Sequence, residues 1–181
     1  MSVYERRYLS LSETAKLLIK KRHPLSSKDL KSLLEEAKHV CPSLVDHINK
    51  KKEIELVEVA SGERIYLQDG KPILVGLERS VMPSLAMSQA LLDAIPKVVV
   101  DMGAVPFVVN GADVMAPGIR SVDDNVKVGD VVLVVDEKYS KGLAVGILIM
   151  DREEILQRRK GKAIKNVHHV GDDVWNWTRS V

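Results

Sequence analysis

Residues 101–121 read DMGAVPFVVNGADVMAPGIRS, an apolar stretch that is interrupted by three glycines and two prolines. Its few polar side chains do not stand beside an obvious catalytic partner. Glycines within an apolar stretch mark positions where the backbone turns sharply or lies close to another group. That group is either another strand of the same fold or a ligand, and the rest of the chain has to decide between them.

The composition describes a folded protein with one large domain or two small ones. The chain has 181 residues, of which 45% are hydrophobic and 29% charged, and these fractions provide a core and argue against disorder. Aromatic residues make up only 4%, so a nucleic-acid surface here cannot depend on many stacked rings. No apolar run approaches the ~20 residues that cross a bilayer, and the N-terminus lacks the apolar core of a signal peptide. We therefore expect no membrane association and a cytoplasmic protein.

Residue types that carry metal or catalytic chemistry are scattered along the chain. The single cysteine, Cys41, excludes an internal disulfide and a cysteine-rich zinc site, and a half-buried structural thiol is favoured over a nucleophile. His168 and His169 are adjacent in a predicted strand, so their side chains point to opposite faces and cannot share one metal ion. Nucleotide-binding, zinc-protease and serine-hydrolase motifs are absent from the sequence. We predict a non-catalytic protein that needs no metal and no cofactor.

The charge is distributed unevenly. Residues 1–52 contain 12 Lys or Arg against 6 Asp or Glu, residues 53–96 contain 3 against 7, and residues 97–181 contain 12 against 12. Short runs of lysine and arginine form three basic clusters, at residues 20–22, 50–52 and 158–162. One such cluster is usually a solvated face. Three in a small protein make a polyanionic partner a reasonable hypothesis.

The first half predicts a helix and a small antiparallel sheet. Ser26 or Ser27 can cap a helix that Pro42 ends, with Asp29 in the first turn, where the helix dipole favours a negative charge. From residue 53 the apolar residues follow a period of two in three segments joined by tight turns, at residues 53–60, 64–68 and 71–78. The Asp69-Gly70 pair between the last two segments is the strongest hairpin signal in the sequence.

Two more elements are predicted in this half. Residues 8–12 alternate and predict a short strand. Residues 83–95 predict a helix that Pro83 opens and that closes before Pro96.

The second half is rich in short Val, Ile and Leu runs punctuated by glycine, which are typical of a compact β-barrel or pseudobarrel. These runs are residues 97–101, 130–135 and 143–150. Residues 151–162 predict a short helical turn, and residues 166–177 predict a closing strand pair. One of Trp175 and Trp177 is expected to pack in the core, and the other to face solvent or a partner. We expect two halves with separate cores that meet near Pro96.

Five short patterns then follow one another in order. They are DxGA from residue 101, GAxVxxPGI from residue 111, GDxVxV from residue 129, AVG from residue 144 and HxxGDxxW from residue 168. This array resembles the PUA domain, the RNA-binding module named for pseudouridine synthases and archaeosine transglycosylases. No synthase, transglycosylase or kinase segment accompanies it. Each pattern is weak alone, and the five in register make the resemblance specific.

The N-terminal half resembles the pre-PUA domain of the malignant-T-cell-amplified protein and ligatin family and of its archaeal relatives. A helix, three strands and a Pro-[Ser/Thr]-Leu motif, here Pro83 to Leu85, stand in the same order. The resemblance implies an α+β fold in two domains. An α+β pre-PUA domain would cover residues 1–95, and a PUA β-pseudobarrel would cover residues 96–181.

The resemblance also implies where RNA binds. Small residues in the stretch from residue 110 to 120 would let an RNA backbone come close to main-chain N–H groups, although tight turns alone also account for Gly103 and Gly118. Only Arg120 is basic in that stretch, so phosphate contacts would be completed from elsewhere, for example by Lys138. The residues implied in RNA binding are Asn110, Gly111, Ala112, Met115, Pro117, Gly118, Arg120, Lys141, Arg158, Arg159 and Lys160.

The function implied is that of a translation-associated factor that binds the acceptor end of tRNA, the small ribosomal subunit or both through its PUA domain. Eukaryotic members of the family work with a partner that carries an initiation-factor-like domain, so a protein partner is implied as well. The alternative is a non-catalytic adaptor that orients RNA in a tRNA or rRNA modification complex.

Overall fold

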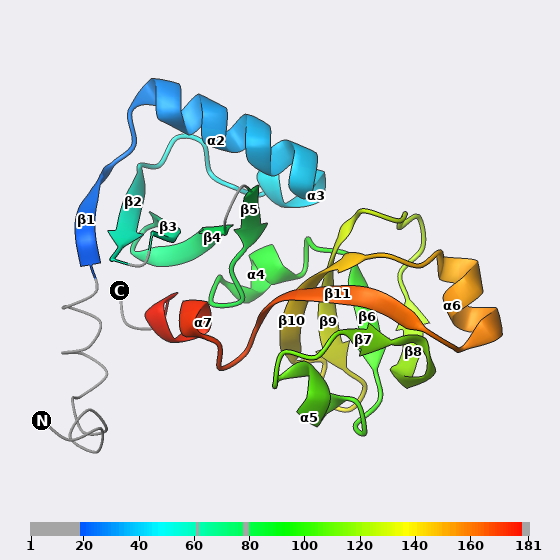
Figure 1. The fold of residues 1–181 in the computed structure, drawn as a ribbon. Helices are drawn as coiled ribbons and strands as arrows, with labels where there is room; N and C mark the ends of the chain where they lie inside the picture. The colour runs from blue at the N-terminus through cyan, green and yellow to red at the C-terminus, as the bar shows by residue number, and fades with distance from the viewer. Residues whose placement is uncertain (1–18, 61, 78–79, 179–181) are drawn as a thin grey trace, which may run out of the picture.

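A computed structural model of the chain describes residues 19–60, 62–77 and 80–178. Within these residues the chain forms two sheets (Figure 1). A five-stranded sheet has the order β1-β2-β3-β4-β5, and a six-stranded sheet has the order β7-β11-β10-β9-β6-β8. The fold is therefore the expected α+β arrangement, in which a sheet-and-helix unit precedes a barrel-like sheet.

The first sheet is an antiparallel meander. Its strands are β1 (Ile19–Pro24), β2 (Ile54–Val59), β3 (Arg64–Gln68), β4 (Lys71–Leu77) and β5 (Ser80–Pro83). The three strands predicted between residues 53 and 78 are confirmed as β2 to β4, and Asp69 and Gly70 turn between β3 and β4 with positive φ of 52° and 71°. Strands β1 and β5, which sequence reasoning missed, form the two edges. The strand predicted at residues 8–12 lies outside the described residues.

Helix α2 (Ser27–Val40) packs on this sheet as its sequence predicts. The Ser26 hydroxyl accepts a hydrogen bond from the backbone N–H of Asp29 at 3.2 Å, which satisfies one of the free donors of the first turn. Pro42 does not simply end the helix, because it opens a second short helix, α3 (Pro42–Val45). Cys41 between them is only 4% exposed, so the thiol is fully rather than half buried, and burial raises its pKa.

The helix predicted over residues 83–95 is wrong in its extent. Pro83 ends β5 and pairs with Leu74, and only Gln89–Leu92 (α4) are helical. Strand β5 lies at the edge of the sheet, where a proline that donates no N–H is tolerated. Pro83 is therefore used as a strand residue, and the helix begins after the extended Ser88.

The second sheet carries the pseudobarrel strands. They are β6 (Lys97–Val100), β7 (Val114–Met115), β8 (Ile119–Val122), β9 (Val131–Asp136), β10 (Gly142–Leu148) and β11 (Lys162–His169). Between them lie α5 (Val105–Val108), the 3-10 turn η2 (Ala116–Gly118) and α6 (Arg152–Arg158), which is the helical turn predicted after β10. Strands β6 and β9 pair in parallel, and the other pairs are antiparallel.

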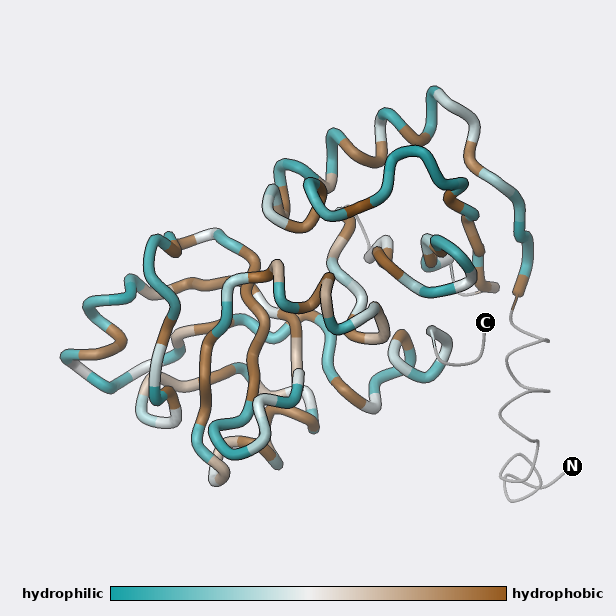
Figure 2. Tube along the Cα trace, turned by 180° about the vertical axis from the view of Figure 1, so that it is seen from behind, coloured by the Kyte–Doolittle hydropathy of each residue, from teal (hydrophilic) through white to brown (hydrophobic). Residues whose placement is uncertain are grey.

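Every residue of β9 is buried, and the alternation of its side chains explains why. Val132 and Val134 face the barrel core, whereas Val131, Leu133 and Val135 belong to the apolar cluster of the N-terminal half. Successive side chains of a strand point to opposite faces, so β9 is covered on both. Figure 2 shows the resulting run of hydrophobic residues along the barrel strands.

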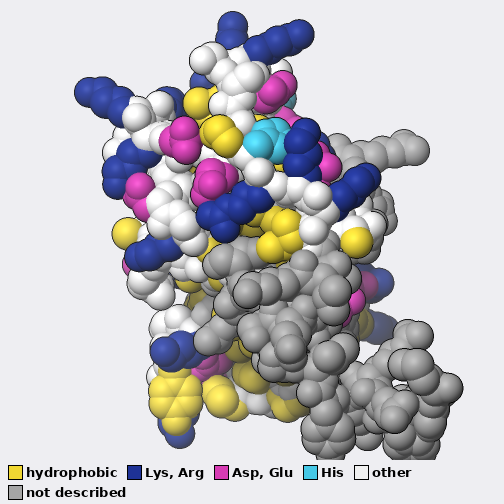
Figure 3. Space-filling view, turned by 90° about the vertical axis from the view of Figure 1, so that its left-hand side faces the viewer, with side chains coloured by type: hydrophobic (Ala, Val, Ile, Leu, Met, Phe, Trp, Pro, Cys, Tyr) yellow, Lys and Arg dark blue, Asp and Glu magenta, His cyan; other side chains and the backbone are white. Residues whose placement is uncertain are grey.

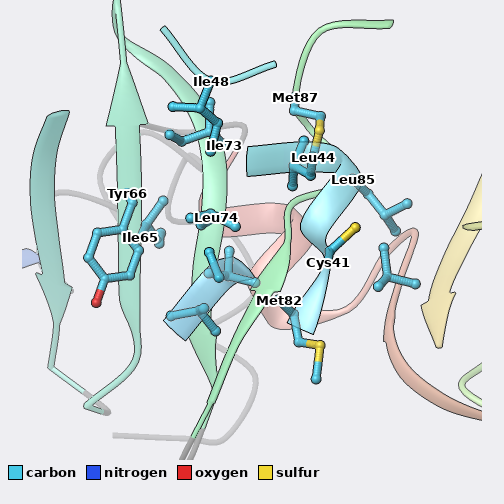
Figure 4. Packing of buried hydrophobic residues seen from close by; sticks show 14 of the residues in the cluster. Cys41, Leu44, Ile48, Ile65, Tyr66, Ile73, Leu74, Met82, Leu85 and Met87 are labelled. Atoms are coloured by element: carbon cyan, nitrogen blue, oxygen red, sulfur yellow. The ribbon is translucent and has the colours of Figure 1, made fainter. Parts of the chain in front are cut away.

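The N-terminal cluster is thus not a separate core. Figure 4 shows Cys41, which lies between α2 and α3, and Leu44 of α3 close to Leu74 and Met82 of the sheet. The same cluster continues into the C-terminal half through Val131, Leu133, Val135, Val145 and Val174. The expectation of two separate cores is wrong for this cluster, since the outer face of β9 needs cover and the N-terminal half supplies it.

The strand pair predicted at the C-terminus is also wrong. Strand β11 is followed by helix α7 (Asp173–Thr178). The Asp172 carboxylate accepts hydrogen bonds from the N–H groups of Trp175 at 2.6 Å and His169 at 2.9 Å, so it caps the helix it precedes. Trp175 and Trp177 are not divided between core and solvent. Both are partly buried against the cluster that the two halves share, which we call the shared cluster.

Candidate nucleic-acid interface

The opening stretch of the sequence folds around α5. Asp101 caps the turn before this helix, because its carboxylate accepts a hydrogen bond from Ala104 N–H at 2.9 Å. A Cβ on Gly118 would lie 3.0 Å from the Cβ of Ala104, so the absence of a side chain lets η2 pass close to α5. This glycine therefore has a packing role of its own.

Gly111 also has a structural reason to be glycine. It ends the turn after α5 with a φ of +85°, and a Cβ there would lie 2.9 Å from Nε2 of His169. A side chain would be strained by the backbone and blocked by the imidazole. Replacing Gly111 would disturb the fold, so this position cannot be used to test RNA binding by itself.

Asn166 of β11 connects α5 to the barrel, and sequence reasoning missed it. Its side-chain amide donates to the carbonyl oxygens of Val108 at 2.9 Å and Ala112 at 3.0 Å. Its backbone N–H donates to the Asp113 carboxylate at 2.8 Å. The same carboxylate pairs with Lys162 at 2.5 Å, and this pairing is the main reason that the pKa of Asp113 lies below its usual range. Asparagine in a strand carries no distinctive sequence signal.

The outer surface of this region is apolar. Phe107 on α5 is 67% exposed, Met115 on β7 is 48% exposed and Met102 is 41% exposed. Asn110, Ala112 and Pro117 are exposed around them. These exposed apolar side chains belong to one segment of the chain, and exposed large apolar side chains are candidates for contact with a partner. We call this surface, from Met102 to Pro117, the α5 face.

A basic loop lies against the α5 face. The guanidinium of Arg159, which follows α6, donates to the carbonyl oxygens of Pro117 at 3.4 Å and Ile119 at 3.3 Å. Lys160 beside it is exposed. The structure therefore places the Arg159 guanidinium against the end of the stretch of residues 110–120. The side chain of Arg158 lies outside what the structure describes.

Arg120 is placed differently. Its guanidinium pairs with Asp101 at 3.3 Å and with Glu137 at 3.4 Å, so two carboxylates offset its charge. It therefore offers less attraction to a phosphate than an unpaired arginine.

The last predicted cations, Lys138 and Lys141, lie on the turn between β9 and β10. Burial would raise the pKa of Asp136 in this turn, but hydrogen bonds from the N–H groups of Tyr139, Lys141 and Lys138 hold it below its usual range. Lys138 lies 5.1 Å from the centre of the Tyr139 ring, and that ring is 62% exposed. The turn reaches the start of the α5 face, because Glu137 accepts a hydrogen bond from Met102 N–H at 3.0 Å.

His168 and His169 diverge as predicted. His168 is fully buried, its Nδ1 lies 2.8 Å from Asp172, and its Nε2 accepts a hydrogen bond from Leu85 N–H at 3.4 Å. The neutral ring with its proton on Nδ1 satisfies both contacts. His169 lies beside Gly111 instead.

Among the described residues no three His, Cys, Asp or Glu side chains come together as a metal site. Within the same residues no helix has the length and apolar character to span a bilayer.

Comparison with known proteins finds relatives of both the barrel and the N-terminal half. The PUA domain family model matches residues 96–170. An uncharacterized protein of Methanocaldococcus jannaschii is 43% identical over 88% of this chain and 98% of its own length. Translation machinery-associated protein 20 of Saccharomyces cerevisiae is 34% identical over 72% of this chain and 76% of its own length.

A human protein and a crystal structure extend the comparison. Malignant T-cell-amplified sequence 2 of Homo sapiens is 29% identical over 82% of this chain and 85% of its own length. The crystal structure of a PUA domain protein from Aeropyrum pernix superposes with a TM-score of 0.74 at 25% identity, covering 90% of this chain and 97% of that one. The matches extend well beyond the barrel into the N-terminal half.

Proposed function

The chain belongs to the family of translation machinery-associated protein 20 and the malignant T-cell-amplified sequences, and from this premise we propose that it is a non-catalytic, cytoplasmic RNA-binding protein of translation. The PUA domain supports RNA binding, and the names of the relatives support a role in translation. The RNA partner is the acceptor end of tRNA, the small ribosomal subunit or both. An initiation-factor-like protein is the expected protein partner.

The observation that carries this proposal is the composition of the α5 face. Its exposed ring, Phe107, offers a surface on which a base can stack. Arg159 and Lys160 lie at its border and can meet phosphates. An apolar platform beside cations is the arrangement by which proteins hold single-stranded RNA ends.

Salt dependence tests the phosphate contacts. Replacing Arg158, Arg159 and Lys160 with alanine should weaken binding to a tRNA transcript and lower the slope of log affinity against log salt by about 0.7–0.9 for each lost contact. Lys20→Ala with Lys127→Ala is the control, because both lysines are exposed and neither belongs to the α5 face. An unchanged slope in the triple variant would place the RNA elsewhere.

A double-mutant cycle tests whether the acceptor end of tRNA contacts Phe107. It combines a change in the protein with a change in the RNA. Phe107→Ala should weaken binding of intact tRNA by about 1–3 kcal/mol if a base stacks on the ring. Removing the single-stranded 3′ end of the tRNA should weaken binding too, and the two losses should not add if the ring and the RNA end touch. Additive losses would show that Phe107 and the acceptor end do not meet.

Co-purification separates translation from RNA modification. Recovery of small ribosomal subunits with the tagged protein supports the proposal. Recovery of a modification enzyme without ribosomal subunits would favour the adaptor hypothesis instead.

A further inference from the structure

A second surface lies on the other half of the molecule, along helix α2. A groove with a volume of about 310 Å³ runs between α2 and the segment that follows it. Val45, which is buried, and Leu30 and Leu34, which are half-buried, contribute its apolar lining. The lining of the groove therefore includes an aliphatic surface.

The position of the two leucines on α2 explains the groove. Leu33 and Ala37 face the core of the N-terminal half, and they occupy one stripe of the helix. Leu30 and Leu34 stand four residues apart on the neighbouring stripe, where they touch the core with part of their surface and line the groove with the rest. The apolar surface of α2 is thus wider than the core needs.

Three lysines line the same groove. Lys31 and Lys38 come from α2, and Lys50 comes from the turn after α3. All three are exposed, and none forms an ion pair with another described residue. Glu35 is the single acidic residue in the lining. Figure 3 shows how lysine and arginine side chains project from the top of the molecule, where α2 lies.

We propose that this groove, which we call the α2 groove, binds an acidic amphipathic segment of a partner protein. Aliphatic side chains of that segment would lie against Leu30, Leu34 and Val45, and its carboxylates would face the lysines. The charge complementarity supports an acidic occupant, and the apolar lining fits the way that amphipathic helices lay their apolar faces into hydrophobic grooves.

The charge and the lining disfavour two other occupants. RNA binding to single strands relies on aromatic stacking, and none of the residues in this lining is aromatic. Residues 1–18 of the same chain contain three Lys or Arg against two Asp or Glu, so they do not complement a basic groove.

The experiment uses the full-length protein with labelled Leu and Val methyl groups, observed by NMR. Two 16-residue helical peptides share one leucine spacing, and their polar positions are Glu in one and Lys in the other. The Glu peptide should shift the methyl signals of Leu30, Leu34 and Val45 saturably, and the Lys peptide should not. Added salt should weaken the effect, because the attraction is partly electrostatic.

Charge-reversal variants make the test specific. Lys31→Glu with Lys38→Glu should weaken binding of the Glu peptide by about tenfold or more, since like charges then oppose each other. Lys20→Glu with Lys127→Glu changes the net charge equally at exposed positions outside the groove, and it should bind as the parent does. Thermal melting of both variants controls for the fold.

Three results would overturn the proposal. One is the absence of methyl shifts with the Glu peptide at millimolar concentration. Another is an oligouridine that shifts the same methyls more strongly than the peptide, which would make the groove an RNA site. The third is a set of contacts from residues 1–18 to these methyls in the free protein. Binding of tRNA at the α5 face should not change in the α2 variants, so failure here and failure of the proposed function remain distinguishable.

Discussion

The two halves of the molecule build their cores in different ways. The barrel cluster consists of residues between Val98 and Ile164 and is complete within the C-terminal half. The cluster of the N-terminal half is completed by side chains from β9, β10 and α7. The N-terminal half therefore depends more on the barrel than the barrel depends on it. The barrel supplies part of the core of the N-terminal half, whereas the N-terminal half only covers the outer face of β9.

Cutting the chain between the halves should produce the largest effect. A fragment of residues 97–181 should fold cooperatively, with a lower melting temperature than the full chain, because its own cluster is intact while Leu133 and Val145 become exposed. A fragment of residues 1–96 should fail to fold, because its core lacks the side chains that complete it. Circular dichroism with thermal melting measures both.

The opposite pattern would break the comparison. If residues 1–96 melted cooperatively and residues 97–181 did not, the shared cluster would belong to the N-terminal half alone. The predicted boundary between the domains at residues 95 and 96 is tested by the same pair of fragments.

Two matched leucine substitutions sharpen the comparison within the barrel. Leu133 and Leu148 are both buried, but Leu133 belongs to the shared cluster and Leu148 to the barrel cluster. Each change to alanine should cost about 2–5 kcal/mol of unfolding free energy. Only Leu133→Ala should alter tryptophan emission of the folded protein, because Trp175 and Trp177, the two tryptophans of the chain, pack against the shared cluster.

The stability of the junction between β11 and α7, which Asp172 holds, should decrease in acid. Burial would raise the pKa of Asp172, but hydrogen bonds from the His168 ring and from the N–H groups of Trp175 and His169 hold it below its usual range. A lowered folded-state pKa stabilises the protein above the ordinary value of about 3.9, and this contribution is lost as pH falls through the folded-state value.

Asp172→Asn should therefore lower stability at pH 7 by about 1.5–3 kcal/mol, since hydrogen bonds to a charged group are lost. The difference from the parent should shrink as the pH falls below about 4. Chemical denaturation at pH 7, 5 and 3 measures this. A difference that stays constant over this range would mean that the carboxylate charge has no part in holding the junction.

The smallest effect is expected at the far edge of the N-terminal sheet. Arg22 of β1 and Glu55 of β2 pair through two hydrogen bonds of 3.2 and 2.7 Å in an exposed position. Arg22→Ala should cost about 0.2–1 kcal/mol, as is usual for surface ion pairs. A loss as large as that of Leu133→Ala, measured in the same denaturation experiment, would show that this edge takes part in the shared core.

Local signals made much of the fold predictable. The cap at Ser26, the Asp69-Gly70 turn and the alternation in β2 to β4 depend on residues close in sequence, and the structure has all of them. The prediction for residues 83–95 was wrong because Pro83 fits both a helix start and an edge strand, and only the pairing with β4 decides between them. The prediction of a strand pair at the end of the chain was wrong because Asp172 caps a helix there, through contacts that a strand pattern does not reveal.

The candidate site was less predictable than the fold. The patterns marked the stretch of residues 110–120, but long-range contacts decide what its side chains do. Arg120 is paired with two carboxylates and Gly111 avoids His169, and both facts join residues far apart in sequence. Phe107 and Asn166 were missed because an exposed ring and a strand asparagine acquire their roles only in three dimensions.

The shared cluster also has a consequence for how the chain folds during its synthesis. The N-terminal half leaves the ribosome first, yet its core is complete only when Val174 has been added. Between Leu92 and Val174 lie roughly 80 residues, which at about 5–20 residues per second take about 4–16 s. For that interval the nascent N-terminal half presents an incomplete apolar face. Because of the order of the two halves along the chain, we expect chaperones that shield emerging apolar surface to bind the nascent N-terminal half.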